Sequence, residues 1–330
     1  MNRRPRLAPL LAAALASTAC SAAPPDRAAG ELPAVSRLAA ANLYVANRNG
    51  NSVTVYAPGA TKPLRTIVDG ISLPVAVAFD AYQNLYVANA KAGTVTVYAP
   101  KSTSVSRTLS KGISNPRGVA LDASGNAYVA NEGQNTVTVY KAGTTDLTQV
   151  IEAGVFAPRA LAFDATGKLY VLDESAVTVY SAKPARNLLL TISQGLTYPF
   201  AMAFDGANDL YVASTGNNTV VEYAPGTSTP LRTISDGVSE PDGLTLDASG
   251  NLYVANELTV TIYPPGGSQT SQTITQGLSA PFCLTVDSSG NLQVANYLAS
   301  TVTQYAPKTE KLTRTISTGV NVPYALGFGP

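Results

Sequence analysis

One five-residue segment, LYVAN or a close variant, occurs seven times in this chain of 330 residues. Successive copies start 42, 42, 42, 41, 42 and 40 residues apart. The copies begin at Leu43, Leu85, Ala127, Leu169, Leu210, Leu252 and Leu292. A fixed period of about 40–50 residues, with several short apolar segments in each unit, is typical of repeat architectures and above all of β-propellers. The repeat therefore predicts the fold, and function is expected at the positions that vary between units.

The unit from Pro241 to Gly277 shows how each repeat is built. Four short segments have strand-like composition and are separated by turn residues. We predict these strands at Pro241–Asp247, Leu252–Ala255, Thr259–Tyr263 and Gln272–Ile274. The turn between the first two contains a Gly, which tolerates positive φ, and is capped by the side chain of Asp247. Four short strands joined by hairpins form one propeller blade.

Other residues recur in every unit and give the number of blades. The Tyr that closes the third strand is Tyr56, Tyr98, Tyr140, Tyr180, Tyr223, Tyr263 or Tyr305. The Pro that opens the first strand is Pro74, Pro116, Pro158, Pro199, Pro241, Pro281 or Pro323. The first LYVAN lacks an upstream Pro strand, whereas the last Pro strand lacks a downstream LYVAN. We therefore predict an all-β, seven-bladed propeller of four-stranded antiparallel blades, in which the C-terminal strand completes the first blade.

The N-terminus is predicted to be an export signal. Residues 1–20 combine three Arg, a short Ala/Leu-rich apolar run and small residues before Cys20. The apolar run is too short for a membrane-spanning helix. Small residues directly before a Cys resemble a lipobox, so we predict lipidation at Cys20, with secretion after cleavage near Ala19 or Ala23 as the alternative. Residues 21–40 are predicted to be a flexible linker, and residues 41–330 the propeller.

The composition of the chain argues against some classes of partner and some kinds of chemistry. The formal net charge is +1, charged residues make up 13%, and no basic run follows the signal, which argues against nucleic-acid binding. The chain has no His, the commonest general base and metal ligand. We expect a monomer that contacts the membrane only through a lipid anchor and lies in the periplasm or at the cell surface.

Residues that repeat faithfully are interpreted as structural. The Asn that ends the LYVAN motif is expected to bond loop backbone, as at Asn47, and the Asp after the first strand is expected to cap its hairpin, as at Asp80. Cys283 occupies a position that is Ala or Gly in the other units, so it is interpreted as a small buried residue.

Two sets of equivalent positions vary strongly between units and are expected at the mouth of the central channel. The residue after the repeat Pro is Val75, Arg117, Arg159, Phe200, Asp242, Phe282 or Tyr324. The residue after the LYVAN motif is Arg48, Ala90, Glu132, Glu174, Thr215, Glu257 or Tyr297. One interpretation pairs Arg117 with Glu132 and Arg159 with Glu174 as satisfied ion pairs. The other is a charged and aromatic pocket, for which we predict Arg117, Arg159, Phe200, Asp242, Phe282 and Tyr324 as ligand-binding residues.

The combination of GNLYVAN, TVTVY and a Pro-x-Gly-x-x-x-Asp strand resembles the NHL and YVTN propeller repeats over about residues 42–329. That resemblance implies a binding platform for a protein, a peptide or a small polar ligand. We predict no cofactor. A minority of related propellers resemble gluconolactonases, whose metal-binding Asp lies in a Pro-Asp-Gly stretch similar to the one containing Asp242. In that alternative Asp242, with Glu240 and Glu257, would bind a divalent cation such as Ca²⁺.

The sequence thus favours an extracytoplasmic binding or interaction module, with envelope proteins, peptides or small polar molecules as its partners. A metal-dependent, lactonase-like hydrolase is the first alternative, and a purely structural envelope scaffold is the second. No catalytic residue is predicted. The fold alone cannot choose between these three functions.

Overall fold

A computed structural model of the chain describes residues 41–307, 309 and 311–330. The predicted signal peptide, the linker of residues 21–40 and the lipidation site at Cys20 lie outside the described residues. Within the described ranges, every helix is too short or too polar to span a bilayer.

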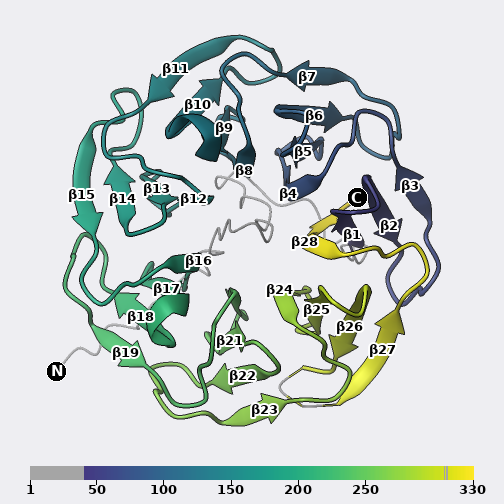
Figure 1. The fold of residues 1–330 in the computed structure, drawn as a ribbon, viewed down its shortest axis with the longest axis vertical. Helices are drawn as coiled ribbons and strands as arrows, with labels where there is room; N and C mark the ends of the chain where they lie inside the picture. The colour runs from purple at the N-terminus through teal and green to yellow at the C-terminus, as the bar shows by residue number, and fades with distance from the viewer. Residues whose placement is uncertain (1–40, 308, 310) are drawn as a thin grey trace, which may run out of the picture.

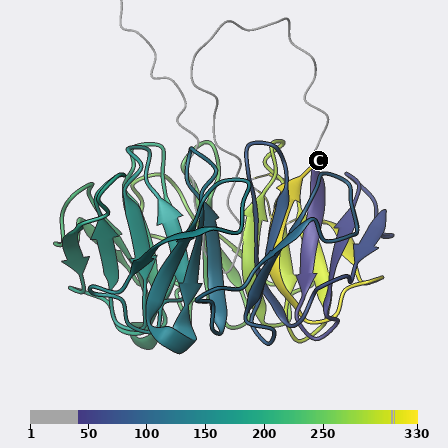
Figure 2. The same ribbon diagram turned by 90° about the horizontal axis from the view of Figure 1, so that it is seen from above.

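The described chain forms a ring of seven antiparallel sheets, each with four strands, around a central channel (Figures 1 and 2). Blade 1 contains β28 (Pro323–Gly329), β1 (Asn42–Asn47), β2 (Ser52–Tyr56) and β3 (Arg65–Ile67). Blade 2 contains β4 (Pro74–Phe79), β5 (Leu85–Asn89), β6 (Thr94–Tyr98) and β7 (Arg107–Leu109). Blade 3 contains β8 (Pro116–Leu121), β9 (Ala127–Asn131), β10 (Thr136–Tyr140) and β11 (Leu147–Ile151). Blade 4 contains β12 (Ala160–Phe163), β13 (Leu169–Leu172), β14 (Val177–Tyr180) and β15 (Leu188–Ile192).

Blades 5 to 7 continue the ring in the same order, with the first strand of each blade innermost. Blade 5 contains β16 (Pro199–Phe204), β17 (Leu210–Ser214), β18 (Thr219–Tyr223) and β19 (Arg232–Ile234). Blade 6 contains β20 (Gly243–Leu246), β21 (Leu252–Ala255), β22 (Val260–Tyr263) and β23 (Gln272–Ile274). Blade 7 contains β24 (Pro281–Val286), β25 (Leu292–Asn296), β26 (Thr301–Tyr305) and β27 (Leu312–Ile316). Two short 3₁₀ helices, η1 (Glu132–Gln134) and η2 (Thr215–Asn217), follow β9 and β17. Strand β20 begins two residues later than predicted, at Gly243.

The predicted ring closure is confirmed by the pairing of the two ends of the described chain. Strand β28 is antiparallel to β1, with Val45 opposite Leu326 and Ala46 opposite Ala325. The Tyr44 hydroxyl also donates to the carbonyl of Pro330 at 2.9 Å. Because β28 completes the sheet, the inner edge of β1 is paired.

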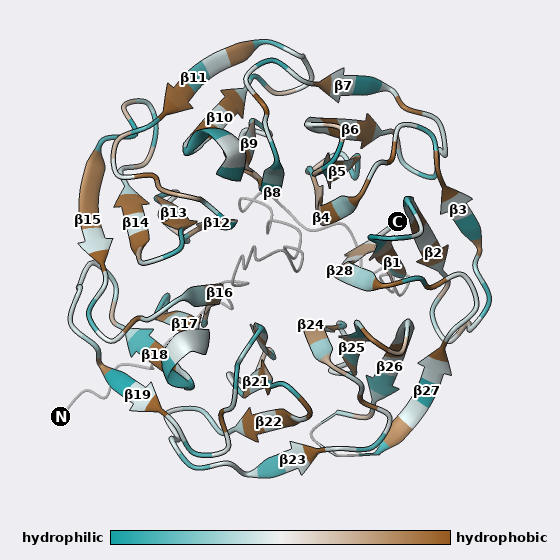
Figure 3. Ribbon diagram, viewed as in Figure 1, coloured by the Kyte–Doolittle hydropathy of each residue, from teal (hydrophilic) through white to brown (hydrophobic). Residues whose placement is uncertain are grey.

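The hydrophobic core lies between neighbouring blades, as the apolar strands predict. Blades 1 and 2 share a buried cluster in which the rings of Tyr44 and Phe79 meet edge to face, 4.9 Å between centroids. The same contact joins Tyr128 to Phe163 at 4.9 Å, between blades 3 and 4. The third strands β10, β14 and β22 alternate Val or Ile with Thr. The outermost strands β7, β19 and β23 carry hydrophilic segments, whereas the outermost strand β15 is largely hydrophobic (Figure 3).

The repeated polar residues are structural, as predicted. Each Tyr that closes a third strand donates its hydroxyl proton to a carbonyl in the linker from the preceding blade; Tyr56 bonds Thr318 at 2.7 Å across the closure. Asn47 Oδ1 accepts the N–H of Asn321 at 3.0 Å. The hairpin-capping Asp80 accepts two backbone N–H groups, including that of Asn84 at 2.8 Å. Cys283 is buried, in agreement with its interpretation as a small core residue.

Gly243 yields a stability prediction that opposes the repeat pattern. Four equivalent positions in other blades carry Ala, so Gly243→Ala would ordinarily count as a consensus substitution. In the structure, however, a Cβ at Gly243 would collide with the carbonyl oxygen of Phe282 in the next blade. Overpacking against backbone of a neighbouring sheet should destabilise the protein by about 1–3 kcal/mol, measurable as a lower urea midpoint.

The matched control is Gly206→Ala, because a Cβ there meets no heavy atom within 4 Å and its φ is not positive. That variant should be neutral or stabilised by up to about 1 kcal/mol through the unfolded state. Equal urea midpoints for Gly243→Ala and the parent would show that blades 6 and 7 are packed less closely than the structure indicates.

Candidate functional site

The loops at one end of the channel share a left-handed backbone position directly before each repeat Pro. All seven of these residues are non-glycine and have φ between 45° and 54°. They are Leu73, Asn115, Ala157, Tyr198, Glu240, Ala280 and Val322. Such a conformation costs about 1–2 kcal/mol per residue, so other interactions must hold these loops in place.

Backbone hydrogen bonds connect these loops to the loops that follow the LYVAN motif. The N–H of Arg48 donates to the carbonyl of Val322, and the N–H of Tyr297 donates to the carbonyl of Ala280, both at 3.0 Å. The two variable sets of positions therefore lie on the same face, as predicted.

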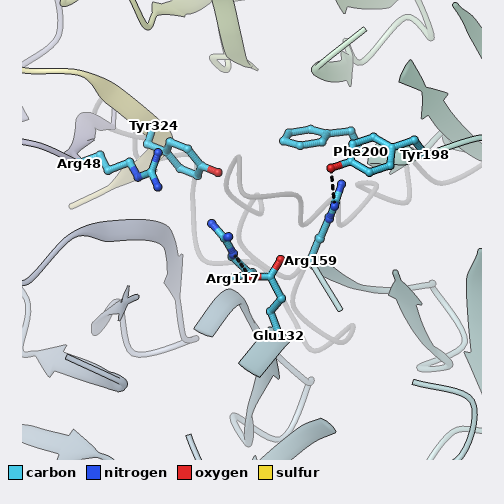
Figure 4. Close-up of a pocket in the computed structure, with 7 residues that line it drawn as sticks. All are labelled: Arg48, Arg117, Glu132, Arg159, Tyr198, Phe200 and Tyr324. Carbon is cyan, nitrogen blue, oxygen red and sulfur yellow. Dashed lines mark hydrogen bonds and ion pairs between the residues drawn. The ribbon is translucent and has the colours of Figure 1, made fainter. Parts of the chain in front are cut away.

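Two hollows occupy this channel mouth, and each of the six predicted ligand-binding residues lines at least one of them. The arginine cavity, of about 330 Å³, is lined by Arg48, Arg117, Glu132, Arg159, Tyr198, Phe200 and Tyr324 (Figure 4). The Asp242 recess, of about 280 Å³, is lined by Arg48, Asp242, Ala280, Phe282, Tyr297 and Tyr324. Because Arg48 and Tyr324 line both, the two hollows are adjacent. The structure thus brings the predicted residues together, while their binding role stays a prediction.

The arginine cavity carries more positive than negative charge. Three guanidinium groups line it, and the carboxylate of Glu132 is the single acidic side chain among its lining residues. Arg117 Nε lies 2.7 Å from Glu132 Oε2, so this pair is satisfied as predicted. Neither Arg48 nor Arg159 has an ion-pair partner among the described residues. Two positive charges are therefore unbalanced at the cavity wall.

The predicted pairing of Arg159 with Glu174 is wrong. Arg159 instead turns to the neighbouring blade, where its guanidinium lies 4.2 Å from the ring centroid of Tyr198 and donates to the Tyr198 hydroxyl at 2.8 Å (Figure 4). The ring of Phe200 is 5.7 Å away. Stacking on an aromatic face stabilises a guanidinium without neutralising its charge. Arg159 thus remains a cation facing the cavity.

Arg48, which follows β1 in blade 1, is held by aromatic side chains in a similar way. Its guanidinium lies 5.0 Å from the ring centroid of Tyr324, and Nη1 donates to the Tyr297 hydroxyl at 3.4 Å. Nε of Arg48 and Nη1 of Arg159 are buried nitrogens without a hydrogen-bond partner among the described residues. Buried donors normally have partners, because an unsatisfied one costs about 1–3 kcal/mol. The two arginines therefore have unused hydrogen-bonding capacity.

Aromatic rings separate the arginine cavity from the rest of the mouth. The ring of Phe282 contacts Tyr324 at 4.6 Å and Phe200 at 5.6 Å, centroid to centroid. Phe200 belongs to blade 5 and Phe282 to blade 7, so this pair bridges the intervening blade 6. Burial raises the pKa of the Tyr324 hydroxyl, although Arg117 and Arg48 act to lower it. Tyr324 is thus a neutral hydroxyl and an apolar ring at physiological pH.

Asp242 lies in blade 6 beside this aromatic group. No described residue donates a hydrogen bond to its carboxylate or forms an ion pair with it; only its backbone N–H is bonded, to Ala255 at 3.0 Å. Burial, with a smaller contribution from the charge of Glu240, raises the pKa of Asp242 to about 6. The carboxylate is therefore largely ionised at neutral pH, yet unpaired.

The metal alternative gains no support from the side-chain geometry. Among the described residues, no group of three or more His, Cys, Asp or Glu side chains is arranged to hold a metal ion. Glu240 is close enough to influence Asp242, whereas both Glu240 and Glu257 are exposed. Binding of a divalent cation by Asp242, Glu240 and Glu257 stays a prediction.

Sequence reasoning identified Arg48, Glu132 and Tyr297 as variable residues but did not include them in the predicted site. Tyr198 was not predicted, because it comes directly before its repeat Pro, whereas the variable set consists of the residues that come directly after that Pro. The signal was present: a bulky Tyr occupies a position at which the backbone is left-handed in every blade. Tyr198 is 45% exposed, and its hydroxyl accepts from Arg159 at the edge of the arginine cavity.

No protein-family model matches the chain, and no curated protein matches it significantly. Among solved structures, a functionally unknown protein from Desulfotomaculum acetoxidans DSM 771 matches with a TM-score of 0.75 and 15% identity, over 88% of this chain and 99% of that one. A streptogramin B lyase matches with a TM-score of 0.69 and 10% identity, over 87% of this chain and 95% of the lyase. At such identities the likeness establishes the β-propeller fold alone. The resemblance to NHL and YVTN repeats remains a prediction.

Proposed function

We propose that the protein is an extracytoplasmic binding module that recognises the anionic group of a small polar ligand, or of a peptide, at the channel mouth. The observation that carries this proposal is the arginine cavity, where two guanidinium groups lack an acidic partner among the described residues. Arg forms charge-assisted, often bidentate bonds with carboxylate and phosphate, which would satisfy the unused donors. The adjacent rings would contact an apolar part of the same ligand.

Two arguments favour binding over a scaffold role, and a third concerns where the protein acts. A purely structural protein gains nothing from the half-buried guanidinium groups of Arg48 and Arg159. Without a compensating partner, such charges lower the stability of the fold. The equivalent positions in blade 2 are Val75 and Ala90, both buried, so the fold itself requires no charge here. The N-terminal sequence further supports export, with lipidation at Cys20 as the proposed means of envelope attachment.

The experiment is calorimetric titration of the exported domain with small carboxylates and phosphate esters that carry a phenyl group, with neutral sugars as the comparison. We expect the anions to bind and the sugars not to. The double variant Arg48→Gln/Arg159→Gln should lose about a hundredfold in affinity, because each charge-assisted bond contributes about 1.5 kcal/mol or more. Affinity should also fall as salt is added.

Lys91→Gln is the matched control, since Lys91 is an exposed cation on the loop after Ala90 and lines neither hollow. It should bind the anions like the parent. Anion binding that survives in a folded Arg48→Gln/Arg159→Gln protein would place the site elsewhere, and equal binding of sugars and anions would remove the electrostatic basis of the proposal.

A further inference from the structure

The channel mouth carries opposite charges in its two adjacent hollows. The arginine cavity has two guanidinium groups without an acidic partner, whereas the Asp242 recess contains a carboxylate without a basic partner among the described residues. Arg48 lines both hollows, yet its side chain is engaged with Tyr324 and Tyr297 and makes no ion pair with Asp242. The charges are therefore separated by aromatic rings rather than neutralised by each other.

The chemistry of the Asp242 recess suits an organic cation. Phe282, Tyr297 and Tyr324 line it with the carboxylate, and the ring of Phe282 lies 5.9 Å from Tyr297 and 4.6 Å from Tyr324. Aromatic faces attract ammonium groups, and the partly buried carboxylate of Asp242 adds an opposite charge. A purely anionic ligand would instead be repelled by this carboxylate and would leave it unpaired.

Building on the proposed binding function, we propose that the ligand is a zwitterion, with its anionic group in the arginine cavity and an organic ammonium group in the Asp242 recess. The anionic group then meets the guanidinium groups that lack an acidic partner, and the ammonium group meets the unpaired carboxylate of Asp242. The same arrangement disfavours simple anions and simple cations, because each would satisfy one hollow and leave the other charged and partly desolvated.

The test compares two matched series of probes in buffer that contains a metal chelator. One series consists of ω-trimethylammonio carboxylates of increasing methylene length, and the other of the isosteric carboxylates in which a carbon replaces the quaternary nitrogen. The pairs have the same shape and anionic group and differ only in the cationic charge. At the best length, the zwitterion should bind about tenfold more tightly than its isostere, the factor expected for a partly desolvated cation–π contact with a carboxylate nearby.

Four variants test whether the preference for the zwitterion over its isostere arises in the Asp242 recess. Asp242→Asn should bring the zwitterion and its isostere to within about twofold of each other, and Phe282→Leu should reduce the preference while keeping the recess apolar. Arg159→Gln should weaken both series equally. Glu174→Gln, which removes a carboxylate of the same loop set that lines neither hollow, should retain the full preference.

Three results would overturn the inference. Equal affinity of both series for the parent would remove the cation site while leaving the proposed anion-binding function intact. A preference that persists in folded Asp242→Asn and Phe282→Leu proteins would place the cation elsewhere. Absence of binding for both series and for the phenyl carboxylates would remove the proposed function, and this inference with it.

Discussion

Removal of Pro323–Pro330 is expected to abolish cooperative folding of the propeller. This segment contains β28, the innermost strand of blade 1, which reaches its sheet only after the chain has passed through all the other blades. Without it, β1 exposes an unpaired edge to the channel, and blades 2 and 7 lose the strand that lies between them. Circular dichroism should show loss of the sharp thermal transition, and size-exclusion chromatography should show aggregation.

The magnitude follows from what β28 buries. Ala325 and Leu326 are completely buried, and Tyr324 is nearly so. Burying one large apolar side chain contributes about 1.5–3 kcal/mol, and the backbone pairing with β1 adds to this. The loss is comparable with the whole stability of a typical domain, about 5–15 kcal/mol. The truncated chain therefore has no margin with which to remain folded.

Deletion of Pro330 alone is the matched control. It removes a carbonyl that lies beyond the paired residues of β28 and accepts from the Tyr44 hydroxyl at 2.9 Å and from Arg65 Nη2 at 3.5 Å. Each of these two partly buried hydrogen bonds contributes about 0.5–1.5 kcal/mol, so this variant should still melt as one cooperative unit, at a temperature moderately below that of the parent. A truncated protein without Pro323–Pro330 that melts like the parent would disprove closure through β28.

The fold was predictable from the sequence because every level of the repeat agrees. Each unit supplies the same apolar strands, closing Tyr and opening Pro, and six of the seven supply the hairpin Asp, so local and global preferences point to one structure. The number of blades and the closure both follow from counting these residues. The boundaries were less certain, as at β20, where Pro241 and Asp242 precede the paired residues rather than joining them.

The candidate site was predictable in position but only partly in its contacts. Equivalent positions of a repeat must lie on one face, which is why all six predicted residues reached the same mouth. The spacing does not determine where a long side chain turns once it is there. Arg117 pairs with Glu132 of its own blade, whereas Arg159 crosses to Tyr198 of the next. That choice depends on rings and loops from two blades, and no single unit of the sequence contains both.

Some contacts between blades come from residues outside the repeat, and the repeat pattern does not predict them. In blade 2, Arg107 of the outermost strand stacks on Tyr86, with 5.6 Å from guanidinium to ring centroid. The register puts Gln149 at the same place in blade 3, opposite Val139. The cation there comes instead from Arg186, in the loop between β14 and β15 of blade 4, and lies 5.0 Å from the ring of Tyr128. A neighbouring blade thus supplies what the repeat omits.

Arg186→Ala is accordingly expected to destabilise the protein by about 3 kcal/mol or more. Arg186 is nearly fully buried between the rings of Tyr128 and Phe163, and it donates to the carbonyls of Gly167 at 2.7 Å and Ser181 at 3.0 Å. The substitution removes these bonds and the packing of the guanidinium between two blades. Urea unfolding should show a lower midpoint with an unchanged slope, because the native fold is retained.

Lys183→Ala separates this role from a simple charge effect. Lys183 Nζ lies 3.0 Å from Asp122 Oδ2, nearer than the 4.0 Å of Arg186, but its side chain is 37% exposed. An ion pair whose basic partner is solvent-exposed contributes about 0–1 kcal/mol, and Asp122 keeps its bonds from Asn126, so this variant should remain close to the parent. Arg186→Lys should recover little, because an ammonium lacks the planar fork that bonds two carbonyls and a hydroxyl at once. Equal losses for Arg186→Ala and Lys183→Ala would mean that charge near Asp122, rather than the guanidinium clamp between blades 3 and 4, carries the stability.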